Sequence, residues 1–307
     1  MELIFMKPYM KEVIWGGEKI KREFNYETNS DKIGEAWIIS ANDNGYSTVI
    51  NGKYKGLTLK ELWNKHKELF GNEKGEIFPL LVKYIDAKSD LSVQVHPDDE
   101  YARANEGQEN GKSEAWYILD CEEGSDIEIG HSAKTKDELR EMVYNKKWNE
   151  LLTYRKIKKG DFFDIPPGTV HAIRKGTLIL EIQQNSDITY RFYDYDRLQN
   201  GKLRELHIEK SLDVTICPHK DTSSIGEKTE NSQLLVKNNY FSVKKYEINE
   251  KVLIENNENF LIVCVINGSG SINNISIKKG DNFIVPYKYG NLTFDGNLEF
   301  MLIRSEK

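Results

Sequence analysis

Short runs of apolar residues, many of them β-branched or aromatic, dominate the chain. Their length and their alternation with polar positions are typical of β-strands. The clearest runs are residues 36–40, 80–86, 115–120, 177–182 and 260–266. The pattern predicts a mainly β-protein.

Helical periodicity is confined to three segments, residues 59–70, 97–104 and 135–152. The third opens with Thr135 and has Glu138 three residues later, which is the spacing of a capping box. We therefore expect a few helices inserted into a framework of sheets.

Two ten-residue segments of the chain are closely similar. Residues 157–166 read IKKGDFFDIP, and residues 277–286 read IKKGDNFIVP. Lys-Lys-Gly-Asp could be a favoured hairpin turn used twice, but the strand, the aromatic position and the closing Pro match as well. We interpret the echo as a duplicated β-unit.

The two similar segments, and the amino-acid composition of the chain between them, predict two domains. Residues 216–232 are rich in Ser, Thr, Lys and Glu, which is typical of a linker. We expect a catalytic unit with helical insertions in residues 1–215 and a second β-unit in residues 233–307. No His occurs after His219, so a metal site would belong to the first unit and the second would serve packing or assembly.

Charge and cysteine usage exclude several classes of protein. The 307 residues carry 43 Lys and Arg against 49 Asp and Glu, a net charge of −6, without a basic arm for nucleic acid. The apolar runs are too short to cross a membrane and no secretory signal opens the chain, so we expect a cytoplasmic protein. The three Cys are widely spaced, which argues against a disulfide framework or a thiolate zinc site.

A possible metal set combines nitrogen and oxygen ligands. Gln94 and His96 lie two residues apart in an extended run and share a face of one strand, as do Lys112 and Glu114. A buried Glu114 needs a counter-charge, which a divalent ion would supply. His171 follows a rigid Pro-Pro-Gly turn and completes the set. The four ligands suit Zn²⁺, although Mn²⁺, Fe²⁺ and Co²⁺ accept the same donors.

Each ligand taken alone has a simpler explanation, because a lone His on a strand is more often a hydrogen-bonded core residue and Gln is seldom a ligand. The remaining histidines lack partners at ligand spacing, and we expect them to be structural or exposed. These are His66, His131, His207 and His219.

The region around His171 resembles the second signature of the cupin β-barrels, with Gly160, Pro166 and Gly168 at the family's spacing. Lys175 stands where that signature has Asn, and Gln94 stands where the first signature has His. This departure is itself similar to the type I mannose-6-phosphate isomerases, in their short bacterial branch. The matching segments are LSVQVHPDDEYA (91–102), GKSEAWY (111–117), GTVHAI (168–173) and QNSDITYR (184–191).

The resemblance implies duplicated cupin (jelly-roll) barrels and an isomerase that interconverts mannose 6-phosphate and fructose 6-phosphate through an enediol(ate). It implies one Zn²⁺ per chain, held by Gln94, His96, Glu114 and His171. It also places Lys112, Asp187 and Arg191 in the same cavity. Arg191 would bind a substrate oxygen or the phosphate, and Asp187 would orient it.

Several points stay open at the level of sequence. Metal-bound water, Lys112 or a nearby carboxylate could carry the proton, and a hydride shift is a further alternative. The same metal set would serve a non-catalytic sugar-phosphate sensor or diverged paralogue, or a metal-dependent oxygenase, whereas a storage-type barrel needs no metal. We expect a monomer or a homodimer whose partner is a small sugar phosphate, and no nucleic-acid or membrane partner.

Overall fold

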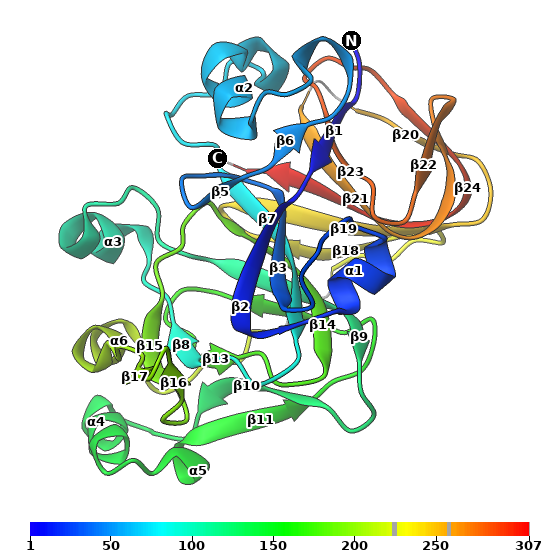
Figure 1. Cartoon of the computed structure of the whole chain (residues 1–307). Coiled ribbons are helices and arrows are strands. Elements are labelled where there is room, and N and C mark those ends of the chain that lie inside the picture. Colours follow the sequence, from blue (N-terminus) through cyan, green and yellow to red (C-terminus); the bar gives the residue numbers. More distant parts are fainter. Residues whose placement is uncertain (223–225, 257–258, 307) are drawn as a thin grey trace.

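The computed structural model describes residues 1–222, 226–256 and 259–306. Its strands form three large antiparallel sheets, so the mainly β prediction is confirmed (Figure 1). Residues 223–225 of the expected linker lie outside the described residues, as do residues 257–258 and 307 of the expected second unit.

Two of the sheets build the first unit. The six-stranded sheet runs in the spatial order β12 (Phe162–Ile165), β9 (Glu114–Cys121), β14 (Thr177–Gln184), β7 (Leu80–Ala87), β3 (Ile33–Ile39) and β2 (Tyr9–Gly17). The five-stranded sheet runs in the order β11 (Leu152–Lys156), β10 (Asp126–His131), β13 (His171–Ala172), β8 (Val93–Val95) and β15 (Tyr190–Tyr193).

The nine-stranded sheet carries the second unit. Its order is β18 (Ser232–Lys237), β19 (Phe241–Ile248), β24 (Leu292–Ser305), β21 (Leu261–Ile272), β23 (Asn282–Val285), β1 (Ile4–Lys7) and β6 (Thr48–Val49), with β20 (Val252–Ile254) on β24 and β22 (Ile275–Lys278) on β21. Ile4 pairs with Ile284, so the start of the chain joins the sheet of its last quarter.

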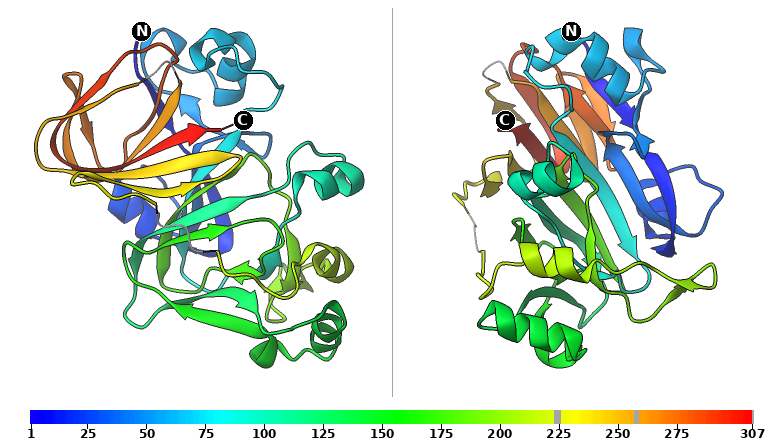
Figure 2. Two further views of the ribbon diagram at one scale, coloured as in Figure 1. Left: turned by 180° about the vertical axis from the view of Figure 1, so that it is seen from behind. Right: turned by 90° about the vertical axis from the view of Figure 1, so that its left-hand side faces the viewer.

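The remaining elements are short. Two small hairpins pair β4 (Ala41–Asn42) with β5 (Gly45–Tyr46) and β16 (Leu198–Gln199) with β17 (Lys202–Leu203). The helices are α1 (Lys19–Phe24), α2 (Leu59–Lys65), α3 (Asp99–Glu106), α4 (Lys136–Tyr144), α5 (Trp148–Leu151) and α6 (Ile208–Val214), with 3-10 turns at Gly52–Tyr54 and Lys67–Phe70. Figure 2 shows α3 to α6 on the side of the first unit away from the second. No helix of the described residues is long and apolar enough to span a membrane.

The expected helix over residues 135–152 divides into α4 and α5, because Lys146 takes a left-handed conformation (φ 53°) that no regular helix contains. Its start is as predicted, with the Thr135 side chain accepting a hydrogen bond from the Glu138 amide. The Glu138 carboxylate instead accepts from the amide of Lys134, one residue before the N-cap.

The two echo segments have the same structure. In both, an Asp side chain accepts a hydrogen bond from the amide three residues earlier, at 2.9 Å for Asp161 and 2.8 Å for Asp281. Gly160 and Gly280 have φ values of 93° and 92°, which only Gly adopts readily. The strand after each turn pairs with the corresponding long strand, β12 with β9 and β23 with β21. The predicted duplication of the β-unit is thereby confirmed.

The six-stranded sheet is buried on both faces, which is why its central strands are almost continuously apolar. On β7, Val82 and Tyr84 belong to a core shared with the second unit, whereas Ile85 faces a separate core inside the first barrel. Because strand side chains alternate, Lys83 points to the barrel side with Ile85. The same alternation places Glu114 and Glu181 on this side, so the barrel receives charge from three strands.

Candidate metal centre and its cavity

Three buried side chains meet at one end of the first barrel. His96 follows β8, Glu114 begins β9 and His171 begins β13. His171 Nε2 lies 3.1 Å from Glu114 Oε1, and His96 Nε2 lies 3.5 Å from Glu114 Oε2. The three ligand atoms fall within 4.8 Å of one another, which is the spacing a metal ion requires.

The hydrogen bonds of the two imidazoles fit a metal ion. His96 Nδ1 lies 2.8 Å from the carbonyl oxygen of Ile188, and His171 Nδ1 lies 2.8 Å from that of Thr169. A carbonyl oxygen only accepts, so each Nδ1 carries the proton and each Nε2 turns a lone pair to the centre. The Glu114 carboxylate is fully buried, and its two oxygens lie beside the imidazoles of His96 and His171. A buried carboxylate needs compensating positive charge, which a divalent ion at this point would supply together with the neighbouring ammonium of Lys112.

Lys112 adds a positive charge next to the three candidate ligands. Its Nζ lies 2.6 Å from Glu114 Oε2 and 3.1 Å from His96 Nε2. Burial opposes ionisation of Glu114, but the ammonium of Lys112 holds the pKa of this carboxyl well below its usual range. Burial and the Lys112 ammonium hold the pKa of His96 well below its usual range. Both side chains are therefore in the protonation state that binds a metal.

Strand register brings Gln94 and Arg191 to the same face as His171. Gln94 on β8 stands opposite His171 on β13 and opposite Arg191 on β15. Directly opposed residues in an antiparallel pair point to one side of the sheet. The Gln94 side chain makes no hydrogen bond to any described residue and lines the adjoining cavity, so its amide oxygen is free to face an ion.

A cavity of about 420 Å³ opens beside the centre. Lys112, Asp187 and Arg191 line it together with Gln94, as the resemblance implied. Its wall also holds charged residues that the sequence reasoning missed, namely Lys11, Glu35, Lys83, Glu181 and Arg204.

Lys83 is the centre of a buried ion network in this wall. Its Nζ lies 3.0 Å from Glu181 Oε2 and 3.7 Å from Glu35 Oε2. Burial opposes the charge of Lys83, but the two carboxylates raise its pKa above the ordinary value. Burial also opposes the charge of Glu35, and Lys83 with Lys11 lowers the pKa of that carboxyl. The signal in the sequence was a charged residue flanked by apolar residues in each of two runs, Lys83 in 80–86 and Glu181 in 177–182.

Arg191 and Asp187 make their hydrogen bonds to other groups, so the expected orientation of Arg191 by Asp187 stays a prediction. Arg191 Nε donates to Ser92 Oγ at 3.3 Å and Nη1 donates to the carbonyl oxygen of Glu205 at 2.7 Å, while Asp187 accepts a hydrogen bond from the Asn44 side chain. The argument assumed one strand from 187 to 191. However, β15 begins only at Tyr190, so the alternation does not reach Asp187.

Comparisons with known proteins agree with this geometry. Residues 3–130 match the model of the phosphomannose isomerase type I catalytic domain, and residues 231–305 match that of the mannose-6-phosphate isomerase cupin domain. The chain is 46% identical to mannose-6-phosphate isomerase ManA of Bacillus subtilis, with 97% of each chain covered, and 44% identical to mannose-6-phosphate isomerase of Streptococcus mutans, with 100% of this chain and 99% of the relative covered. The chain belongs to the type I phosphomannose isomerase family.

The fold of the family is shared over the whole chain. The crystal structure of mannose 6-phosphate isomerase from Bacillus subtilis superposes with a TM-score of 0.96 at 46% identity, covering 99% of this chain and 100% of that one. Type I phosphomannose isomerases are metal-dependent enzymes, and His96, Glu114 and His171 form a group able to hold the metal here.

The other four histidines lie outside the metal group of this family member. His66 is near Glu68, His131 near the carbonyl oxygen of Ile216, and His219 near Asp221. His207 has a role that the sequence did not reveal, because its Nδ1 accepts a hydrogen bond from the backbone amide of Arg191 at 3.2 Å. It therefore fixes the strand that presents Arg191 to the cavity.

Proposed function

We propose that this chain is a Zn²⁺-dependent isomerase that interconverts mannose 6-phosphate and fructose 6-phosphate through an enediolate. The observation that carries the proposal is the cluster of His96, Glu114 and His171 beside a cavity lined with cations, with Lys112 belonging to both. The relatives named above support the substrate, and the nitrogen and oxygen donors favour zinc among divalent ions.

We propose Gln94 as the fourth metal ligand, in addition to His96, Glu114 and His171. With one carboxylate and three neutral ligands, the site keeps a net positive charge when it holds a divalent ion. A divalent ion held by these residues would supply Lewis-acid polarisation of the sugar carbonyl. The negative oxygen of an enediolate is stabilised by positive charge that is already in place, which makes this ligand set suitable for the reaction.

We assign binding of the substrate phosphate to Arg191 and Arg204. Burial and the neighbouring Arg204 lower the pKa of the Arg191 guanidinium, as expected for two like charges held close together. Arg204 is fixed by Asp194, whose Oδ2 accepts from Arg204 Nε at 2.6 Å. A phosphate dianion relieves the repulsion and accepts paired hydrogen bonds from a guanidinium.

Proton transfer between C1 and C2 of the sugar needs an acid–base group in the cavity wall. Lys112 and Glu181 both line the cavity, and both are buried. We assign the proton transfer to this pair, with Lys83 holding Glu181 in place. Incorporation of solvent deuterium at C1 or C2 of the product is expected, whereas a hydride shift would leave the sugar free of deuterium.

We further propose that catalysis is confined to residues 1–215 and that residues 233–307 form a structural unit joined by the linker 216–232. The core of the second unit supports this division, because it consists of apolar residues such as Phe283, Phe294 and Phe300.

The deciding experiment combines elemental analysis with a coupled assay on mannose 6-phosphate. We expect about one zinc per chain, loss of turnover after chelation and recovery when zinc is added back. Full turnover in metal-free protein would contradict the metal role. Tight binding of the sugar phosphate without turnover would instead identify a sensor.

A further inference from the structure

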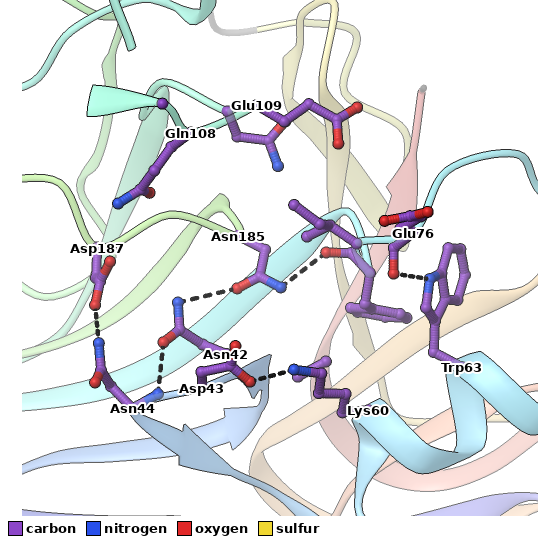
Figure 3. Close-up of a pocket in the computed structure, with 15 residues that line it drawn as sticks. Asn42, Asp43, Asn44, Lys60, Trp63, Glu76, Gln108, Glu109, Asn185 and Asp187 are labelled. Carbon is purple, nitrogen blue, oxygen red and sulfur yellow. Dashed lines mark hydrogen bonds and ion pairs between the residues drawn. The ribbon is translucent and has the colours of Figure 1, made fainter. Parts of the chain in front are cut away.

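A second cavity of about 470 Å³ adjoins the first and shares Asp187 with it. It is enclosed by the loop 41–44, by α2, by the segment 76–78 and by the loop 107–110 that follows α3. Figure 3 shows Gln108 and Glu109 on one side of this cavity, Asn42 and Asn185 on the other, and Asp187 at its edge. Its volume lies in the range of about 300–1,000 Å³ that is usual for small-molecule sites.

The charge of the second cavity is opposite to that of the first. Among its described lining residues are four carboxylates, Asp43, Glu76, Glu109 and Asp187, and one cation, Lys60, which pairs with Asp43. The first cavity has five cations, Lys11, Lys83, Lys112, Arg191 and Arg204, against three carboxylates, Glu35, Glu181 and Asp187. A phosphate dianion is attracted to the first cavity and repelled by the second.

Carboxamides distinguish the second cavity from a simple acidic patch. Asn185 is only 7% exposed, and its Nδ2 donates to the carbonyl oxygen of Phe78 at 2.9 Å. Its Oδ1 accepts only a long hydrogen bond, 3.4 Å, from Asn42 Nδ2. A carboxamide offers a donor beside an acceptor, which matches a hydroxyl group, and carboxylates accept from neighbouring hydroxyls.

We propose that the second cavity binds an uncharged polyhydroxylated ligand, a neutral hexose or a polyol, beside the sugar-phosphate site. The amides and carboxylates select hydroxyl groups, and the negative charge rejects phosphorylated sugars. Because Asp187 lines both cavities, the two ligands would lie side by side, and we expect both to be bound at the same time. Binding of the neutral ligand does not depend on the proposed function.

The test is equilibrium dialysis of labelled D-mannose, which has the hydroxyl groups of the proposed substrate without its charge. We expect about one mannose per chain, with a Kd on the order of 1 mM, in the presence of saturating mannose 6-phosphate. Loss of mannose binding when the sugar phosphate is added would overturn the proposal, because the mannose would then occupy the catalytic cavity. Absence of binding would also overturn it.

Variants locate the site. The double variant Gln108→Ala/Glu109→Ala removes two exposed polar side chains of the loop and should weaken mannose binding about tenfold or more. Turnover of mannose 6-phosphate by this variant should persist. Glu100→Ala, on α3 but outside the cavity, is the matched control and should bind mannose like the original chain. Unchanged binding by the double variant would place the ligand elsewhere and refute the assignment. Turnover, measured separately, tests the proposed function alone.

Discussion

The two β-units each contain a copy of the same turn, but their interiors bury different kinds of side chain. In the first, the strands beside the turn carry Glu114 and Glu181 into the barrel. In the second, the corresponding interior contains Phe283, Phe294 and Phe300, and the last two rings stack with centroids 4.1 Å apart. Burying charge is unfavourable unless it is paired, whereas burying aromatic surface is favourable. The comparison supports our proposal that the first unit carries the chemistry and the second contributes stability.

The largest effect should come from the metal centre. His171→Ala removes a ligand, so we expect loss of metal and a fall in kcat on the order of 10⁴-fold, since charge stabilisation of several kcal/mol is lost. Metal analysis and the coupled assay measure both. His66→Ala, at the C-cap of α2 and outside the metal group, is the control and should keep metal and turnover. Full metal occupancy in the His171 variant would show that the first unit does not use this residue as a ligand.

The second unit should respond in stability alone. Phe300 is fully buried and also stacks on Tyr246 at 5.0 Å, so Phe300→Ala should cost about 3–5 kcal/mol of unfolding free energy. Metal content and kcat of the folded fraction should remain unchanged. Leu253→Ala, on an exposed position of the same unit, should change stability by less than about 0.5 kcal/mol. A fall in metal content of the folded Phe300 variant would erase the distinction between the units.

Arg191→Ala should lower kcat/KM about 100-fold while metal content stays intact, because a charge-assisted contact to substrate is lost and no metal ligand is touched. Steady-state kinetics with metal analysis on the same sample measures this outcome. Arg140→Ala, which removes a surface ion pair with Glu209, is the matched control. Unchanged kinetics would remove Arg191 from the site.

The smallest expected effect is on the pH dependence of folding stability. Burial raises the pKa of Glu128 on β10 to about 7, against the lowering influence of Arg174. Between the ordinary carboxyl pKa and about 7, the folded chain binds more protons at this group than the unfolded chain. Its contribution to stability therefore falls as pH rises through that window.

Glu128→Gln should remove this fall and stabilise the first unit by about 2 kcal/mol at pH 8. Urea unfolding followed by Trp fluorescence is a suitable measurement, because all five Trp lie before residue 150. Glu250→Gln, at an exposed position of the second unit, should leave the pH dependence as it is. An identical pH dependence in the Glu128 variant would mean that this buried carboxyl is not its source.

Local pattern was sufficient for much of the fold and for part of the site. The runs at 80–86 and 177–182 became β7 and β14 within two residues of the predicted ends, because alternation and β-branching act over a few neighbours. The echo predicted the second barrel. His96, Glu114 and His171 were identified by residue type and by resemblance, and the structure brings these three together.

Other features required distances that sequence does not contain. Lys83, Glu35 and Glu181 lie in three different strands, and only strand register makes them one ion network. The pairing of β1 with β23 joins positions 4 and 284. The sequence also did not show where β15 begins, because that start depends on pairing with β8 as well as on local propensity.

The sequence by itself determined the strands, the duplicated turn and the residue types available for a metal, since each is expressed within a short stretch of chain. Tertiary structure alone decided which charges face each other, and it separated a positive cavity from a negative one on either side of Asp187. The physical reason is that electrostatic interactions depend on distance in space, which strand pairing sets between residues far apart in the chain.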